Sequence, residues 1–138
     1  MKRTEPQARY WTYQLADGWS AMAGKSDVDN DLLSFRLSRP TDWWLHVSGM
    51  PGSHVLLRHA EDASLAPGRD VLQAAAQIAA YHSKGRDGGN CTVNVCRACD
   101  VSKPPHSPAG LVSISRYRNL RVRPALPAAE TQNPPSGA

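Results

Sequence analysis

The sequence predicts an α+β domain with a mostly antiparallel sheet and one main, alanine-rich helix packed on it. Three observations predict this fold: two pairs of strand-like runs, each joined by turn residues, and one segment with apolar residues at helical spacing. The chain has 138 residues, the size of one domain with enough core to fold alone. We place the domain at residues 10–124 and expect residues 125–138 to form a disordered tail, because they consist mainly of Pro, Ala, Gly and polar residues.

The first strand pair lies near the N-terminus. Residues 10–15 and 19–23 are strand-like, and Asp17-Gly18 between them is a strong hairpin signal. A polar loop is expected over residues 24–31; it lacks the glycine and glutamate of an EF-hand, so we expect no calcium there. Residues 32–37 fit a short helix capped by Asn30 or Asp31 and also fit a strand, and we favour the helix.

The second strand pair carries the most informative residues. Residues 44–47 and 55–57 are strand-like and flank the turn residues 48–53. If the strands pair about Met50, His46 lies opposite His54, and directly opposed residues share one face of a sheet. That face carries Asp42, Trp44, His46, His54 and Arg58, whereas the other face is apolar. We interpret the apolar face as core and the polar face as a functional surface.

The main helix is expected over residues 70–84. Asp70 can cap it, Gln73 stands where a capping-box partner belongs, and Gly85 is a typical stop. A flexible basic loop over residues 84–90 follows. Further strands are expected at residues 92–95, 111–115 and 120–123, with a proline-stiffened loop over residues 103–110 and a tight turn at Asn119.

The three cysteines form a C-x4-C-x2-C pattern at Cys91, Cys96 and Cys99. Zinc would need a fourth ligand, for which His106 is the nearest candidate. Residues 91–96 alternate like a buried strand, in which cysteine behaves as a small apolar residue. We therefore expect no metal and no cofactor. An odd cysteine count, the absence of a signal peptide and the absence of a membrane-length apolar run favour a cytoplasmic protein without a membrane partner.

Positive charge is concentrated in the second half of the chain. Residues 84–123 contain eight Lys or Arg against two Asp, whereas residues 1–83 are nearly balanced. Basic patches attract anionic partners, of which nucleic acid is the commonest in the cytoplasm. The alternative is a solvated basic face without a partner.

Several short motifs occur together in one order along the chain. They are Asp17-Gly18, Gly24-Lys25, Asn30-Asp31-Leu32-Leu33, Asp42-x-Trp44-Leu45-His46, Pro51-Gly52-Ser53-His54-Val55, Ala74-Ala75-Ala76, Ala79-Ala80-Tyr81-x-Ser83-Lys84-x-Arg86, Val101-x-Lys103-Pro104, Gly110-x-Val112 and Val122-x-Pro124. This series covers about residues 10–124 and resembles the NFACT-R domain, which is named for proposed RNA binding.

The resemblance implies an RNA-binding function. Such domains usually end longer proteins that are similar to ribosome quality control factors, which bind the large ribosomal subunit and tRNA and extend stalled chains. Selection of tRNA is attributed to other parts of those proteins, so chain extension does not carry over, and for this chain we expect a stand-alone, non-enzymatic RNA-binding module. Its expected partners are structured RNA (rRNA or tRNA) and the large ribosomal subunit, without DNA specificity.

The predicted interface combines three kinds of residue. Phosphate contacts are expected from Lys25, Lys84, Arg86, Lys103, Arg116 and Arg118. Stacking and hydrogen bonds are expected from Trp44, His46 and His54, and the polar motif residues Asn30, Asp42, Ser53 and Ser83 complete the set.

Two alternative functions remain open. The first is a small hydrolase, metal-dependent or acid–base, that uses Asp42, His46 and His54. The second is a protein-interaction module in which both histidines are structural.

Overall fold

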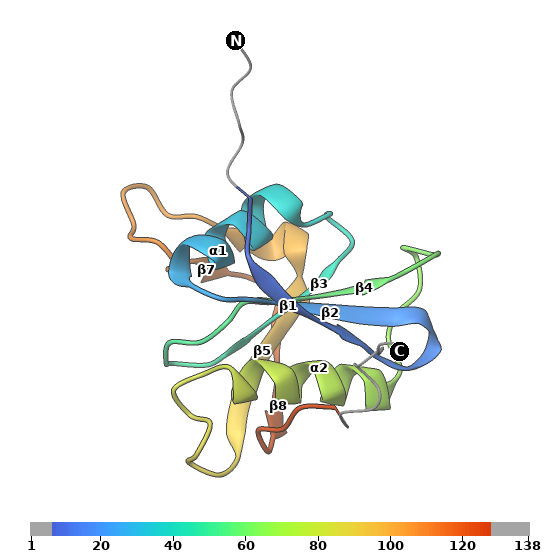
Figure 1. Cartoon of the computed structure of the whole chain (residues 1–138). Helices are drawn as coiled ribbons and strands as arrows, with labels where there is room; N and C mark the ends of the chain where they lie inside the picture. The colour runs from blue at the N-terminus through green and yellow to red at the C-terminus, as the bar shows by residue number, and fades with distance from the viewer. Residues whose placement is uncertain (1–6, 128–138) are drawn as a thin grey trace.

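In a computed structural model, which describes residues 7–127, a six-stranded antiparallel sheet separates two layers (Figure 1). The strand order is β1-β2-β4-β3-β5-β8, and every pair of neighbours is antiparallel. The strands are β1 (Tyr10–Gln14), β2 (Trp19–Gly24), β3 (Trp43–Val47), β4 (Val55–His59), β5 (Cys91–Arg97) and β8 (Arg118–Val122). The predicted α+β class is confirmed.

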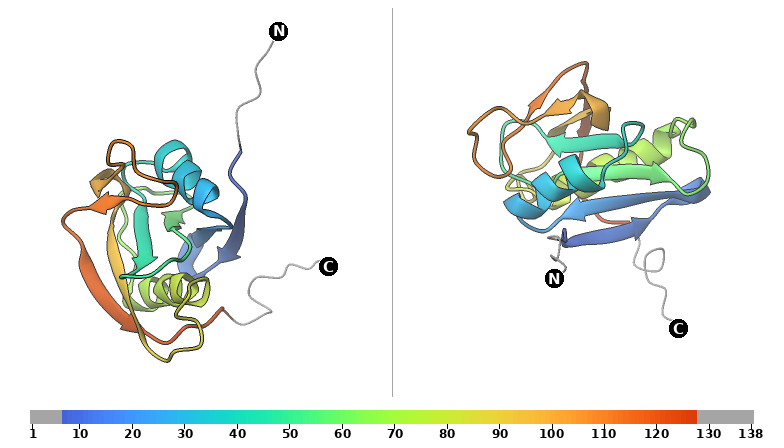
Figure 2. Two further views of the ribbon diagram at one scale, coloured as in Figure 1. Left: turned by 90° about the vertical axis from the view of Figure 1, so that its left-hand side faces the viewer. Right: turned by 90° about the horizontal axis from the view of Figure 1, so that it is seen from above.

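Each face of the sheet is covered by different elements. The long helix α2 (Arg69–Tyr81) lies on one face, as predicted. The short helix α1 (Asp27–Leu32) lies on the other, together with the small pair β6 (Val101–Ser102) and β7 (Ser113–Ile114) (Figures 1 and 2). Both faces are therefore partly withdrawn from solvent.

Both predicted hairpins form, and the second has the expected register. In β1–β2, Asp17 and Gly18 in the turn adopt φ values of 60° and 85°, the left-handed region that Asp-Gly turns favour. In β3–β4, Trp44 pairs with Leu56 and Leu45 with Val55. This register places His46 opposite His54, as pairing about Met50 requires.

The sheet has a core on each side. The larger core lies between the sheet and α2 and includes Leu45, Val47, Val55 and Leu57, so the predicted apolar face of the β3–β4 hairpin is confirmed. The second core lies under α1 and the segment containing β6 and β7. Its buried members are Met22, Leu33, Trp44, Leu56, Cys96 and Val101.

Both helices begin elsewhere than the sequence indicates. Helix α1 begins at Asp27 because Ser26 caps it, its Oγ accepting a hydrogen bond of 3.1 Å from the backbone N of Asp29. Part of the expected polar loop is thus helical, and α1 continues into a π-helical turn at Leu33–Leu37. Helix α2 begins at Arg69 without a side-chain cap, so the predicted Asp70 cap is wrong.

The C-terminal end of α2 also departs from the prediction. The helix ends at Tyr81 rather than near residue 84, because the next residues turn to pair with another loop. The backbone N of Lys84 donates to the carbonyl of Pro51 over 3.0 Å. Tertiary pairing therefore ends the helix before the glycine that the sequence indicates.

The later strands differ in length from those predicted. Strand β7 spans only Ser113–Ile114, and Asn119 pairs with Asn94 inside β8 instead of forming a turn. The left-handed residue in this region is Arg116, with φ 49°. Cys91 and Cys96 are buried in β5 and Cys99 is exposed; all three are free thiols.

The segment after β8 runs beside α2. The backbone N of Ala125 donates to the carbonyl of Gln77 over 3.4 Å. Residues 128–138 of the predicted tail lie outside the described residues. Between residues 7 and 127, no helix is long and apolar enough to cross a membrane.

Candidate nucleic-acid interface

The face that carries His46 and His54 is buried rather than open. The two rings are in edge contact, with centroids 5.2 Å apart. His54 is 0% exposed and Trp44 is 1% exposed, because α1 and the segment around Val112 and Ile114 pack over them. The interpretation of this whole face as a functional surface is therefore wrong; the His46 end borders a cavity.

A single serine satisfies two of these buried rings. The Oγ of Ser34 accepts a hydrogen bond of 2.9 Å from the indole Nε1 of Trp44 and lies 2.8 Å from Nδ1 of His54. The indole can only donate, so the serine keeps its own hydroxyl hydrogen, and Nδ1 of His54 is an acceptor within reach of it. We assign the hydroxyl as the donor to Nδ1, an assignment that leaves the imidazole proton on Nε2. Burial lowers the pKa of His54 to about 4, so this ring is neutral at pH 7.

Asp42 is bound to Arg58 at the opposite end of β3 from the 48–54 connection. The ion pair is 2.6 Å long, and Nε of Arg58 donates to the other carboxylate oxygen over 2.9 Å. Asp42 also accepts from the backbone N of Arg39. The Asp42 side chain is 3% exposed and holds Arg58 and the Arg39 backbone in place. Its role is therefore structural, whereas the sequence predicted a place in the interface with His46.

The predicted hydrolase triad does not assemble. Asp42 is engaged by Arg58 as described, and His54 has its Nδ1 on Ser34. Across residues 7–127, no group of three or more His, Cys, Asp or Glu side chains is arranged to hold a metal ion.

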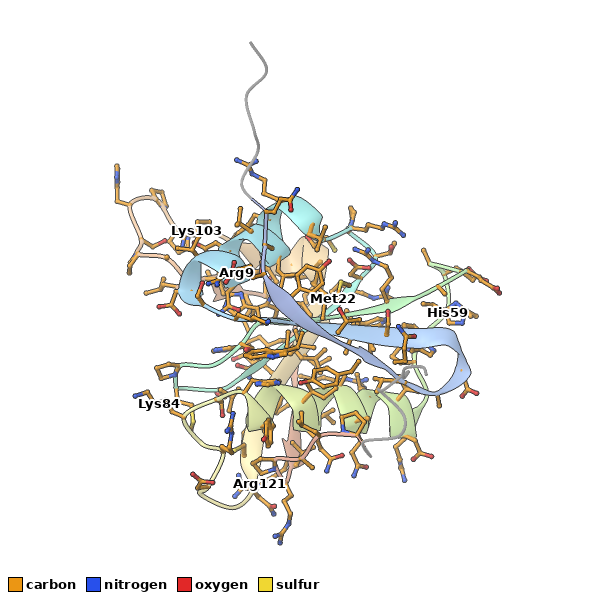
Figure 3. All side chains as sticks on the ribbon, viewed as in Figure 1. Arg9, Met22, His59, Lys84, Lys103 and Arg121 are labelled. Atoms are coloured by element: carbon orange, nitrogen blue, oxygen red, sulfur yellow. The ribbon has the colours of Figure 1, made fainter. Side chains whose placement is uncertain are left out.

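Five of the predicted interface residues meet at a different place, a cleft of about 330 Å³ that we call the cationic groove. It lies where the 48–54 connection meets the end of α2, and Lys84 extends outward there (Figure 3). The groove is lined by Trp11, Lys25, Pro51, Gly52, Ser53, His82, Ser83, Lys84 and Arg86.

Backbone hydrogen bonds join the two loops that form the cationic groove. Gly52 pairs with Ser83, and the backbone N of Ser53 donates to the carbonyl of His82 over 2.8 Å. The close approach requires a glycine, since a Cβ on Gly52 would come within 2.7 Å of the Ser83 side chain. The groove is thus a rigid feature of the fold.

An aromatic pair forms one wall of the groove. The rings of Trp11 and His82 stack with centroids 4.0 Å apart and planes 7° from parallel, and Trp11 remains 37% exposed. The hydroxyl of Tyr13 lies 2.7 Å from Nε2 of His82. Burial and the nearby Arg86 lower the pKa of His82 to about 4, so its ring is neutral at pH 7.

The charge of the groove comes from three cations. Nζ of Lys25 lies 5.2 Å from the centroid of Trp11, and Arg86 lies over the ring of Tyr81. In the described part of the chain, none of Lys25, Lys84 and Arg86 forms an ion pair. Their charges are therefore available to an anionic ligand.

The sequence missed Trp11 and His82 as interface residues. Trp11 stands two positions before Tyr13, so the two side chains share one face of β1. Nothing in the sequence indicates that this face lies beside the end of α2. His82 stands in the last turn of the expected helix, where the helix dipole alone explains a histidine. Only the tertiary structure brings the two rings together.

The polar motif residues position the groove. Nδ2 of Asn30 donates to the carbonyl of Gly52 over 3.2 Å, and its Oδ1 accepts from the backbone N of His54 over 3.0 Å. Ser53 donates to the carbonyl of Gly24. These contacts attach the 48–54 connection to α1 and to the last residue of β2.

Three predicted phosphate-binding residues lie away from the groove. Lys103 makes an ion pair of 3.0 Å with Asp31 on the α1 side of the sheet (Figure 3). Arg116 makes one of 2.9 Å with Asp100. Arg118 belongs to a second cleft of about 490 Å³, which it lines with Arg69, Gln73 and Arg121 among others.

Comparison with known proteins identifies the family. Residues 9–116 match the family described as the NFACT protein RNA binding domain. The chain belongs to this family. This NFACT domain is 33% identical over 113 residues to the Rqc2 homolog RqcH of Bacillus subtilis. The match covers 82% of the chain and 19% of that protein. It is 32% identical over 124 residues to the Rqc2 homolog RqcH of Streptococcus suis, covering 89% of the chain and 21% of that protein.

A solved structure is similar as well. The C-terminal part of the fibronectin/fibrinogen-binding protein from Streptococcus suis superposes on this NFACT domain with a TM-score of 0.76 and 29% sequence identity. The match covers 89% of this chain and 47% of that one. The chain spans about a fifth of the length of the RqcH relatives that it matches.

Proposed function

We propose that this NFACT domain binds RNA through the cationic groove. The observation that carries the proposal is the convergence of Lys25, Lys84 and Arg86 around the partly exposed Trp11 ring in one preformed cleft. Phosphate binding requires unpaired cations, and an exposed aromatic ring beside them is what RNA-binding surfaces use to stack bases. Membership of a family described as RNA-binding supports the same function.

The proposed ligand is structured RNA, either rRNA or tRNA, and the domain acts without catalysing a reaction. Similarity to the RqcH proteins supports a translation-related partner, for which the large ribosomal subunit is the candidate. The proposed site of action is the cytoplasm.

The salt dependence of binding tests the role of the three cations. RNA affinity falls with salt by a log–log slope of about −0.7 per neutralised phosphate on single strands, so the groove alone accounts for a slope of about −2. Lys84→Ala should weaken binding of all sequences alike and reduce the slope by about one contact. Fluorescence anisotropy with labelled rRNA and tRNA fragments, repeated over a series of salt concentrations, measures both quantities.

Two further variants separate stacking from charge. Trp11→Ala should weaken binding by about 1–3 kcal/mol without changing the salt slope, because stacking releases no counterions. Arg123→Ala is the matched control, since this exposed arginine belongs to the same basic segment but lines neither cleft. If no RNA binds at low salt, or if Lys84→Ala binds like the Arg123→Ala control, the proposal is wrong.

A further inference from the structure

We propose that a pocket beside the cationic groove holds one unpaired nucleobase of the bound RNA. This inference rests on the proposed function and adds the kind of RNA that the domain recognises. The pocket has a volume of about 530 Å³ and lies on the α1 side of the sheet, between the 48–54 connection and residues 109–114. Pro51 and Gly52 line both the pocket and the groove, so the two sites are adjacent.

The lining of the pocket is unsuited to phosphate. Its walls are mainly apolar, with contributions from Met50, Leu111, Val112 and Ile114, and the charged side chain among its lining residues is the carboxylate of Asp27. A phosphate would lose its hydration there without gaining a cation. A neutral, flat ligand matches such walls, and a base is the neutral, flat part of a nucleotide.

Two polar side chains give the pocket a hydrogen-bonding edge. His46 on β3 pairs directly with Asn94 on β5, and both line the pocket. Nδ2 of Asn94 donates to Asn119 over 2.7 Å, which leaves its Oδ1 as an acceptor for a ligand. Imidazole and amide groups together can meet the donors and acceptors of a base edge.

His46 keeps its hydrogen-bonding groups in the neutral form at pH 7. Burial lowers the pKa of His46 to about 4, so its ring carries no charge and offers one donor and one acceptor. The imidazole contacts His54 and Trp44, with ring centroids 5.2 Å and 5.9 Å away, and so is held in place before any ligand arrives. This rigidity lowers the entropic cost of binding.

The arrangement explains why the two sites are neighbours. RNA that places a phosphate on Lys84 or Lys25 has its attached sugar beside the 51–52 turn, over which an unstacked base can reach the pocket. A base paired within a helix cannot leave the stack without an unpairing cost. The proposal therefore predicts selection of loops, bulges or ends over continuous duplex.

Nucleosides without phosphate test the pocket independently of the cationic groove. In NMR titrations of the labelled full chain with adenosine, guanosine, cytidine or uridine, the side-chain amide of Asn94 and the methyl of Met50 should shift. The shifts of Asn94 and Met50 should persist in Trp11→Ala, and no resonance should respond to ribose alone. The exposed Leu111→Ala variant and His46→Ala should both reduce the response.

His106→Asn is the matched control. It removes an exposed imidazole from the neighbouring loop at a residue that does not line the pocket, and asparagine tolerates the φ of 62° at this position. Near-ultraviolet circular dichroism and thermal melting establish that each variant is folded before its titration is interpreted.

An RNA experiment links the pocket to the bound strand. Each loop nucleotide of a binding hairpin is replaced in turn by an abasic site, which keeps the phosphate. One replacement should weaken binding at least fivefold without changing the salt slope, and Leu111→Ala should remove this difference.

The outcomes distinguish the two proposals. If every abasic hairpin binds within twofold of the parent, or if nucleosides shift no pocket resonance, the base pocket is wrong while salt-dependent binding through Lys84 still stands. If no RNA binds at all, the proposed function fails and the base pocket falls with it.

Discussion

Ser34 connects two buried rings on the α1 side of the sheet. It is 3% exposed, and its hydroxyl bonds both Trp44 and His54. Both rings are almost fully buried, so bulk solvent cannot replace that oxygen, and one hydroxyl satisfies a nitrogen of each ring. The same contact sets the tautomer of His54.

Removing this hydroxyl is expected to destabilise the fold. Ser34→Ala leaves the Trp44 Nε1 and His54 Nδ1 atoms buried without a partner, at a cost of about 2–4 kcal/mol in the free energy of unfolding. Urea unfolding followed by tryptophan fluorescence measures it. Ser113→Ala, at an exposed serine, should change stability by less than about 0.5 kcal/mol. Equal effects of the two substitutions would contradict the role assigned to Ser34.

The buried histidines predict loss of stability in mild acid. The pKa of His54 is about 4 in the folded chain, because burial and the neighbouring His46 disfavour the charged ring, against about 6.5 when unfolded. Between these values the unfolded chain binds more protons, so stability is complete above pH 6.5 and falls as the pH decreases toward 4. Asp31 and the Gly110 backbone oppose the shift without reversing it.

Protonation of His54 alone should lower the free energy of unfolding by on the order of 3 kcal/mol between pH 6.5 and pH 4. Urea midpoints measured from pH 7.5 to pH 4 should fall, and the decrease should be smaller in His54→Gln. A midpoint that stays constant over this range would show that the ring is not held neutral.

At the scale of elements, the 48–54 connection joins three parts of the fold. It pairs with the residues after α2, it is bonded by Asn30 at the end of α1, and Ser53 reaches the carbonyl of Gly24 in β2. A connection of this length between two strands could adopt many conformations on its own. These contacts select one, which is why the cationic groove and the pocket on either side of it have defined shapes.

Gly24→Ala should disturb this connection. A Cβ at Gly24 would overlap the Oδ1 of Asn30, the atom that accepts from the His54 backbone. We expect a loss of about 1–3 kcal/mol in unfolding free energy and weaker RNA binding, since the side chain that positions Gly52 must move. Gly88→Ala is the control, because a Cβ there meets its nearest neighbour at an ordinary 3.6 Å and should leave both quantities unchanged.

At the scale of the whole molecule, two basic clefts lie at opposite ends of α2. The cationic groove is at the C-terminal end, and the cleft with Arg69, Arg118 and Arg121 is at the N-terminal end. The helix has 13 residues, so about 20 Å separates its ends. An RNA must be longer than this distance to contact both clefts at once.

Ligand length should therefore reveal the second cleft. Arg118→Ala combined with Arg121→Ala should weaken binding of a structured RNA and reduce its salt slope by about two contacts. The same double variant should bind a trinucleotide like the unaltered chain, because so short a strand occupies one cleft at a time. Isothermal titration calorimetry with both ligands decides this. If the double variant lost equal affinity for the structured RNA and for the trinucleotide, Arg118 and Arg121 would not form a separate second contact.

Most local structure of this protein could be predicted from its sequence. Alternation and turn chemistry are local properties, so the Asp17-Gly18 hairpin and the register that places His46 opposite His54 followed from them. The boundaries of α1 and α2 did not, because Ser26 competes with Asn30 as a cap and the pairing of Lys84 with Pro51 ends α2 early. Caps and tertiary hydrogen bonds decide boundaries that periodicity leaves open.

The sequence alone determined which side chains share a face of the sheet, because the period of a strand is two, and it determined the family through an ordered series of motifs. It did not determine which face meets solvent, since that depends on what packs above it. Helix α1 covers His54 and Trp44, whereas the end of α2 brings His82 beside Trp11 at an open edge. Burial is a sum over the whole fold, and for that reason only the tertiary structure showed that the His46 end of the histidine face stays open, beside the groove at the end of α2.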